Sequence, residues 1–206
     1  MSVRAYVLSC EERAEVCAET VADLGQSDWG SPPTVVIDDS TAERKLQRIN
    51  ETGVRLLAQA VDEWNGHDDD VILFCEDDVA FNRSLRHNLE RWTPIVERRA
   101  DGHLFGSLYN PNVVAPAADG FTATVADPRR FYGSQGMVMS VTTARSLVEQ
   151  WDDGHGPLDL RISRLAARWS PLWYHSPSLV QHRAVDSTWG GAPHSAIDFS
   201  VDWRAR

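Results

Sequence analysis

The sequence contains no long hydrophobic run. Its longest apolar stretches, such as Val71–Cys75, fall far short of the roughly 20 residues that a membrane-spanning helix needs. The hydrophobic stretch near the N-terminus, AYVLSC, is shorter than the about 7–15 residues at the centre of a secretory signal peptide. We therefore expect a soluble chain that neither crosses a membrane nor is exported, and that works in the cytoplasm.

Cysteine is scarce, with only Cys10, Cys17 and Cys75 in the whole chain. The number is odd, so the residues do not form a complete disulfide set, and their spacing does not match a zinc site. We expect reduced thiols packed inside strands and helices, as is usual for a cytosolic protein.

Positive charge is also in short supply. Thirty acidic residues face twenty basic ones, which gives a formal charge of −10. Since duplex nucleic acids are bound mainly by neutralising their phosphates, this balance argues against a general nucleic-acid binder. The sequence also lacks GxxxxGK and GxSxG segments, and no GxGxxG follows the first expected strand. P-loop NTPases, typical α/β-hydrolases and typical dinucleotide enzymes are therefore excluded as leading hypotheses.

What is present indicates one α/β domain. The 206 residues are 42% hydrophobic, which is enough for a single sizeable core. Short β-rich runs alternate with helical stretches over the first 110 residues. The expected strands are 5–10, 34–37, 71–75 and 103–108, and the expected helices are 11–24, 40–64 and 85–99. This alternation predicts a Rossmann-like, mostly parallel sheet flanked by helices on both faces.

Two further local patterns refine this prediction. Ser40 and Glu43 match a capping box that would open the helix 40–64. The second half is less regular: we expect strands at 137–140 and 172–174, helices at 142–151 and 159–168, and a loop or short hairpin over 110–127. Such an irregular second half is typical of a partner-binding wall.

The pattern that carries most chemistry is VILFC followed by Glu76, Asp77 and Asp78. Ligands of open α/β sheets bind at the carboxyl edge, where this buried strand ends. Three adjacent carboxylates repel one another and call for a compensating cation. Oxygen ligands of this kind suit Mg²⁺ or Mn²⁺, which bridge carboxylates to substrate phosphates. The alternative is a solvated acidic turn.

Two other segments favour a site at the same edge. The strand TVVI is followed by Asp38 and Asp39, although Asp38–Ser40 could simply cap the next helix. The apolar segment PSLVQ ends in His182, which is either a further metal ligand or a structural histidine. Trp189 and Trp203, in the polar C-terminal part, are candidates for acceptor contact.

Four segments, taken in order, resemble a known family. They are YVLS at 6–9, VILFCEDDV at 71–79, YGSQGMVMSVTTARSLV at 132–148, and PSLVQH with VDST at 177–188. Together they resemble glycosyltransferases of the GT-A fold, with the nearest likeness to the lipopolysaccharide-type and collagen-type galactosyltransferases. The resemblance covers about residues 3–190 and implies one GT-A-like domain over 1–206. It divides the chain into a nucleotide-binding half (1–110), an acceptor-side half (111–190) and a polar tail (191–206).

The resemblance also implies roles for individual residues. Glu76, Asp77 and Asp78 match the DxD triplet of the family, in an EDD version. Asp78 would bind the divalent cation with His182, and Glu76 would lie near the ribose or at a second coordination position.

Four further positions follow from the same likeness. Arg13 would lie beside the nucleotide, Asp39 would contact its base, and Gln135 would belong to the floor under the donor sugar, 133–136. Asp159 would meet the acceptor hydroxyl as the base of an inverting transfer. Here the chain departs from the family, because Pro157-Leu158-Asp159 stands where a Glu-Asp pair is usual.

The expected function is therefore a metal-dependent transfer of sugar from a nucleotide sugar, expected to be a UDP-sugar, with Mn²⁺ or Mg²⁺ as cofactor. The acceptor is open: a glycan, lipid, protein, small molecule or modified nucleobase. One alternative is another metal-dependent nucleotide enzyme, such as a nucleotidyltransferase or phosphohydrolase. The other is a catalytically silent module that binds nucleotide sugars.

Overall fold

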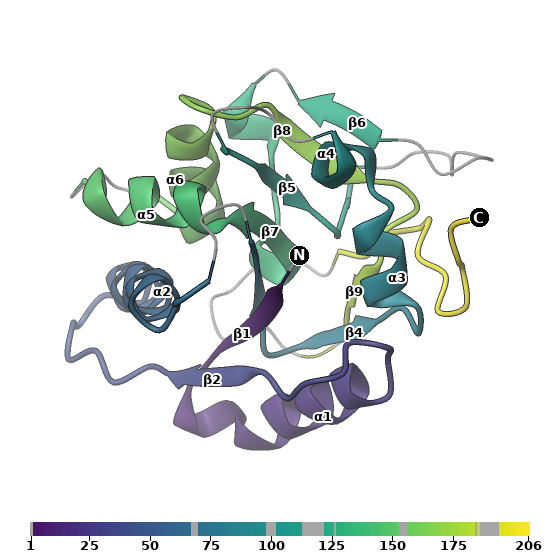
Figure 1. Cartoon of the computed structure of the whole chain (residues 1–206). Coiled ribbons are helices and arrows are strands. Elements are labelled where there is room, and N and C mark those ends of the chain that lie inside the picture. Colours follow the sequence, from purple (N-terminus) through teal and green to yellow (C-terminus); the bar gives the residue numbers. More distant parts are fainter. Residues whose placement is uncertain are drawn as a thin grey trace.

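The computed structural model describes residues 2–66, 70–97, 102–112, 122–125, 127–152, 156–183, 185 and 194–206. In these residues the chain forms a seven-stranded sheet in the order β2-β1-β3-β7-β5-β8-β6, flanked by helices (Figure 1). β7 runs antiparallel to both of its neighbours and β6 runs antiparallel to β8, while the other neighbouring pairs are parallel. The predicted α/β class with a mostly parallel central sheet is confirmed.

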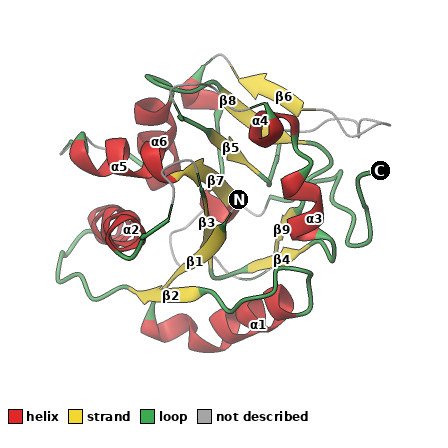
Figure 2. Cartoon of the chain, viewed as in Figure 1, coloured by secondary structure: helices red, strands yellow, loops and turns green. Residues whose placement is uncertain are grey.

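Strands and α-helices alternate from residue 3 to residue 76, and after that elements of the same kind often follow one another. In Figure 2 the helices are red and the strands yellow. The strands are β1 (Val3–Ser9), β2 (Thr34–Ile37), β3 (Val71–Glu76), β4 (Val79–Phe81), β5 (Phe105–Ser107), β6 (Thr122–Val125), β7 (Met137–Ser140), β8 (Leu172–His175) and β9 (Val180–His182). The α-helices are α1 (Ala14–Gly25), α2 (Lys45–Asp62), α3 (Leu85–Glu90), α4 (Thr93–Val96), α5 (Val141–Glu149) and α6 (Leu158–Ala166). None of the helices in the described residues is long and apolar enough to cross a membrane.

Successive side chains of the central strands point to opposite faces and bury two separate cores. On β3, Leu73 and Cys75 join a cluster with α1, α3 and α4, whereas Ile72 and Phe74 join a cluster with α2, α5 and α6. Because both faces are covered, the strand is a continuous apolar run rather than an alternating one. Cys10, Cys17 and Cys75 are all free thiols and buried, as the sequence predicts.

The helix expected from residue 40 begins five residues later, at Lys45. Ser40 does not cap it: its hydroxyl donates to Glu51 and accepts from the amide of Ala42, while its own amide donates to Asp38 Oδ1 at 3.0 Å. Such local side-chain to backbone bonds hold a short polar segment outside the helix. The predicted capping box is therefore wrong.

The single helix expected at 85–99 is also wrong, because the chain forms two short helices, α3 and α4. Pro94 lies in the first turn of α4. A proline has no amide hydrogen and its ring clashes with the carbonyl four residues earlier, here Glu90, where α3 ends. The predicted strand at 103–108 exists as β5 but does not pair with β3, since β7 lies between them.

The sequence does not predict β4 and β9, which form a separate two-stranded antiparallel sheet. β4 begins directly after Asp78, and its Val79 pairs with His182 of β9. The backbone amide of Arg183 donates to the carbonyl of Asp78 at 2.7 Å. This small sheet therefore brings the late segment PSLVQH against the end of β3.

Candidate functional site

The acidic triplet, in which Glu76 ends β3 and Asp77 and Asp78 follow it, lies at the carboxyl ends of the parallel strands, as expected. Leu8 of β1 pairs with Glu76, so the end of β1 lies beside them. Ser9 Oγ donates to Asp77 Oδ2 at 2.6 Å, and the hydroxyl of Thr20 on α1 donates to the Asp77 carbonyl at 2.6 Å. Asp77 is thus fixed by both the neighbouring strand and the following helix.

Arg13 supplies positive charge to this cluster from within the chain. Its Nε donates to Asp77 Oδ1 at 2.8 Å and its Nη2 donates to Asp78 Oδ2 at 2.6 Å. The Arg13 side chain is only 11% exposed. Burial raises the pKa of Asp77, although the bonds from Ser9 and Arg13 oppose that rise. Arg13 therefore compensates two carboxylates that the sequence predicts to need a cation.

Asp78 and His182, which the family resemblance expects to bind one cation, lie in contact. His182 Nε2 is 3.3 Å from Asp78 Oδ2, and both side chains are almost fully buried. Burial alone would raise the pKa of Asp78, but His182 and Arg13 outweigh it and lower that pKa. The hydrogen bond with Asp78 in turn raises the pKa of His182. The other carboxylate oxygen of Asp78, Oδ1, is buried and has no hydrogen-bond partner in the described part of the chain.

Glu76 belongs to a different set of partners from Asp77 and Asp78. Ser134 Oγ donates to Glu76 Oε1, and Gln135 Nε2 donates to Glu76 Oε2 at 3.1 Å. Burial and the nearby charge of Asp78 raise the pKa of Glu76 to about 7. The structure thus joins the predicted floor segment 133–136 to the first residue of the triplet.

Asp159 lies in the first turn of α6 and holds the same floor from the other side. Its Oδ2 accepts from the amide of Gly133 at 2.9 Å. Gly133 has φ +100°, a conformation that favours glycine. A Cβ at this position would meet Gln135 Oε1 at 2.6 Å and Tyr109 Cδ1 at 2.9 Å, so no other residue fits here without a shift.

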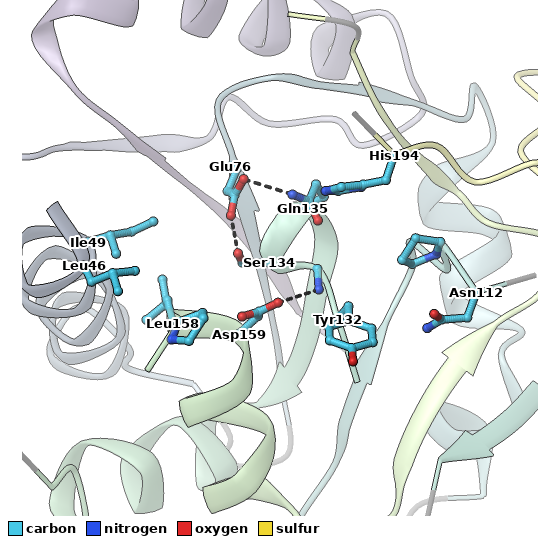
Figure 3. A pocket seen from close by; sticks show the side chains of 13 residues that line it. Leu46, Ile49, Glu76, Asn112, Tyr132, Ser134, Gln135, Leu158, Asp159 and His194 are labelled. Carbon is cyan, nitrogen blue, oxygen red and sulfur yellow. Dashed lines mark hydrogen bonds between the residues drawn. The ribbon is translucent and has the colours of Figure 1, made fainter. Parts of the chain in front are cut away.

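A cavity of about 550 Å³ opens between α2, α6 and this floor (Figure 3). Its volume lies in the usual range for a small-molecule site. The described residues that line it are Leu46, Ile49, Glu76, Pro111, Asn112, Tyr132, Gly133, Ser134, Gln135, Pro157, Leu158, Asp159 and His194. Three of the predicted site residues, Glu76, Gln135 and Asp159, are therefore brought together in one cavity.

His194, which comes from the C-terminal part of the chain, is a site residue that the sequence analysis does not predict. Its ring stacks on that of His182, with centroids 4.8 Å apart, and its Nδ1 lies 2.5 Å from the hydroxyl of Tyr109. His194 thus links the Asp78–His182 pair to the cavity that it lines. A lone histidine in a polar segment carries no spacing signal, so only the folded chain could identify it.

Two other candidates lie elsewhere. The Asp39 side chain is 74% exposed, forms an ion pair with Arg55 and does not line the cavity. The ring of Trp203 packs against that of His175, and the backbone carbonyl of Trp203 accepts from the side chains of Asn82 and Asn88. Trp203 packs against the core that contains Leu73 and Cys75. Trp189 lies outside the described residues.

The donor set at Asp78 is compatible with a divalent cation. Asp78 Oδ1 is a buried carboxylate oxygen without a partner, and an imidazole nitrogen of His182 lies beside the same carboxylate. Among the described residues no three His, Cys, Asp or Glu side chains form a ready-made metal site. Cations that bridge substrate phosphates, however, commonly use only one or two carboxylates. Asp78 and His182 would hold such an ion, with Glu76 as the predicted further ligand.

No protein-family model matches the chain, and no curated protein matches it.

Proposed function

We propose that this protein is a metal-dependent glycosyltransferase with a GT-A-like fold, which moves a sugar from a nucleotide sugar to a hydroxyl of an acceptor. The donor is a UDP-sugar and the cation Mn²⁺ or Mg²⁺, as the family resemblance implies. The observation that carries the proposal is a buried carboxylate at the carboxyl edge of the sheet: one oxygen of Asp78 has no partner among the described residues. The cavity of small-molecule size next to Glu76 of the same triplet supports it.

A divalent cation held by Asp78 would support the binding of a diphosphate at this edge. Glycosyl transfer releases a nucleoside diphosphate, so negative charge builds up on the leaving group. When bound, a divalent cation acts as a Lewis acid that stabilises this charge. Arg13 and His182 are the cationic or potentially cationic groups that contact Asp78, and they keep that carboxylate ionised.

The floor of the cavity supports the transferred sugar and the acceptor. Ser134 and Gln135 hold Glu76, and Asp159 holds the amide of Gly133, so the floor is fixed before substrate arrives. In an inverting transfer the acceptor oxygen attacks the anomeric carbon as the bond to the diphosphate breaks. Asp159 then accepts the proton of the acceptor hydroxyl, a role that needs only a carboxylate within hydrogen-bond reach.

The test is release of nucleoside diphosphate from a panel of sugar nucleotides, with Mn²⁺, with Mg²⁺ and with a chelator. We expect cation-dependent release from one donor in the wild-type protein, with water or an added glycoside as acceptor. Asp78→Asn should abolish it. Glu90→Gln is the matched control, because Glu90 is an exposed carboxylate on α3 that pairs with Arg86.

Three results would overturn the proposal. Full activity of Asp78→Asn would remove Asp78 from the site. Consumption of a nucleoside triphosphate or phosphoester without sugar transfer would indicate a nucleotidyltransferase or phosphohydrolase. Tight binding of a sugar nucleotide without turnover under any cation would indicate a silent binding module.

A further inference from the structure

The cavity beside Glu76 is lined by acidic residues, which is unusual for the active site of an enzyme that uses nucleotides. Among its described lining residues there are two carboxylates, Glu76 and Asp159, and no lysine or arginine. Arg13, the nearest guanidinium to the triplet, is held by Asp77 and Asp78 and does not line the cavity. An anionic group in this space would meet like charge, with no lysine or arginine among the described lining residues to pair with it. His194 is the imidazole in the described lining, and burial lowers its pKa.

One wall of the cavity is apolar. Figure 3 shows Leu46 and Ile49 facing the cavity from α2, with Leu158 of α6 beside them. Leu46 is 50% exposed, so this wall is open to an incoming molecule. An aliphatic group laid against these side chains would be removed from water.

The apolar wall is built into the packing of α2 against α6. The side-chain amide of Asn50 donates from Nδ2 to the carbonyl of Leu46 at 2.6 Å and to the carbonyl of Gly156 at 2.9 Å. Gly53 leaves room for Leu158, whose Cδ1 would lie 2.6 Å from a Cβ at that position. The wall therefore exists before a ligand binds, which lowers the cost of ordering it.

The opposite wall offers hydrogen-bond acceptors. Gln135 is 94% buried, since its exposed fraction is 6%, and its Oε1 has no hydrogen-bond partner in the described chain although the residue lines the cavity. The carboxylates of Glu76 and Asp159 are acceptors when ionised. A ligand that satisfies this wall must present donors, and hydroxyl groups are donors without charge.

We propose that the acceptor of this site is a neutral glycoside: an uncharged, hydroxyl-rich ring that carries an aliphatic substituent. The ring hydroxyls face Gln135, Glu76 and Asp159, and the substituent lies on Leu46, Ile49 and Leu158. Acceptors that bear a carboxylate or phosphate near the ring are rejected. The assignment rests on the proposed transferase function, because it names the substrate that receives the sugar.

Binding of synthetic glycosides, measured by calorimetric titration below their micelle concentrations, tests the proposal without any turnover. The panel pairs octyl glucoside, galactoside and mannoside with the methyl glycosides and with octyl glucuronide and galacturonide. The best octyl glycoside should bind at least about tenfold more tightly than its methyl counterpart, because of the apolar wall. It should also bind at least about tenfold more tightly than the octyl uronide, because the carboxylate of the uronide would lie near Asp159 with no lysine or arginine among the described lining residues.

Two variants distinguish binding at the apolar wall from nonspecific binding. Leu46→Lys places a positive charge on an exposed position of the apolar wall, so it should weaken the octyl glycoside and strengthen the octyl uronide. Val96→Lys is the control: Val96 is 64% exposed, lies on α4 and does not line the cavity, so this change should alter neither affinity.

The proposal is overturned if no octyl glycoside binds, if the uronides bind as tightly as the neutral glycosides, or if Leu46→Lys behaves like Val96→Lys. These outcomes are distinct from failure of the transferase. If neutral glycosides bind as expected but the protein turns over no sugar nucleotide, the ligand class is supported and the transferase function is refuted. If the protein transfers sugar and prefers anionic acceptors, the transferase function is supported and the neutral glycoside is refuted.

Discussion

Acidic residues lie at the ends of two parallel strands of the sheet, β2 and β3. The contacts that these residues make differ between the two strands. After β2, Asp38 is buried and accepts bonds from Thr52, Arg48 and the amide of Ser40, while Asp39 is exposed and pairs with Arg55. All of these partners lie within about twenty residues along the chain. The carboxylates after β2 are therefore held by residues that lie close to them in the sequence.

After β3 the partners come from far along the chain. Glu76 is bonded by Ser134 and Gln135, and Asp78 contacts Arg13 and His182, yet keeps one buried oxygen without a partner. A buried polar atom that lacks a partner is costly unless something else satisfies it. The same pattern, an apolar strand followed by carboxylates, thus produces a structural turn at β2 and a candidate site at β3.

The largest expected effect concerns the β3 end. Asp78→Asn keeps the shape of the side chain but removes its charge, so turnover should fall at least about 10³-fold, as is typical for loss of a main electrostatic stabiliser. Circular dichroism establishes that the variant is folded, and diphosphate release measures the loss. Activity that stays near the wild-type level would place the chemistry away from β3.

The ion pairs at the two strand ends should also differ in strength. Arg13→Met leaves Asp77 and Asp78 buried without their cation, so the free energy of unfolding should fall by about 3–5 kcal/mol. Arg55→Met at the β2 end breaks an exposed pair with Asp39 and should cost about 0–1 kcal/mol. Urea unfolding of both variants makes the comparison, and equal losses would refute it.

Asp159→Asn tests the base at the far side of the cavity. The amide oxygen of Asn can still accept from Gly133, so the floor and donor binding should be kept while turnover falls by about 10²-fold. Steady-state kinetics with donor titration separates the two quantities. If turnover is unchanged, Asp159 serves only to hold the floor segment.

The smallest effect is expected at Asp38. Burial alone would raise its pKa, but the bonds from Ser40, Thr52 and Arg48 outweigh burial and lower that pKa. Its stabilising contribution is therefore complete above the unfolded pKa of about 3.9 and is lost as the pH falls through the folded pKa. Asp38→Asn should cost about 1–3 kcal/mol of unfolding free energy at neutral pH.

The pH dependence supplies the control for Asp38. At about pH 3 the gap between wild type and Asp38→Asn should narrow, because this pH lies below the unfolded pKa of about 3.9 and Asp38 takes up a proton in the unfolded chain. Urea unfolding at the two pH values measures the gap. A gap of equal size at both would show that the charge of Asp38 is not what stabilises the β2 end.

The sequence predicted the features that depend on nearby residues. The strands at 34–37 and 137–140 are where periodicity placed them, and the carboxylates of the EDD triplet do lie at the carboxyl edge of the sheet. The errors also have local causes. Ser40 bonds to Glu51 instead of capping α2, and Pro94 interrupts the helix expected at 85–99.

What the sequence could not predict depends on contacts across long separations. The pairing of β4 with β9 brings His182 to Asp78, and no local pattern reveals the register of two such short strands. The role of Arg13 as the partner of two carboxylates, 64 and 65 residues away, is equally invisible in a linear pattern. Leu46 and His194 line one cavity although they lie 148 positions apart in the chain of 206 residues.

Thermal unfolding with sugar nucleotides, in the presence and absence of Mn²⁺, tests the central claim most directly. A ligand at 100 times its dissociation constant adds roughly 2.7 kcal/mol to stability, which a melting curve detects readily. The account predicts a Mn²⁺-dependent rise in Tm with one sugar nucleotide, kept in Glu90→Gln and lost in Asp78→Asn. No rise with any sugar nucleotide, or the same rise in Asp78→Asn, would contradict a nucleotide-sugar site at the end of β3.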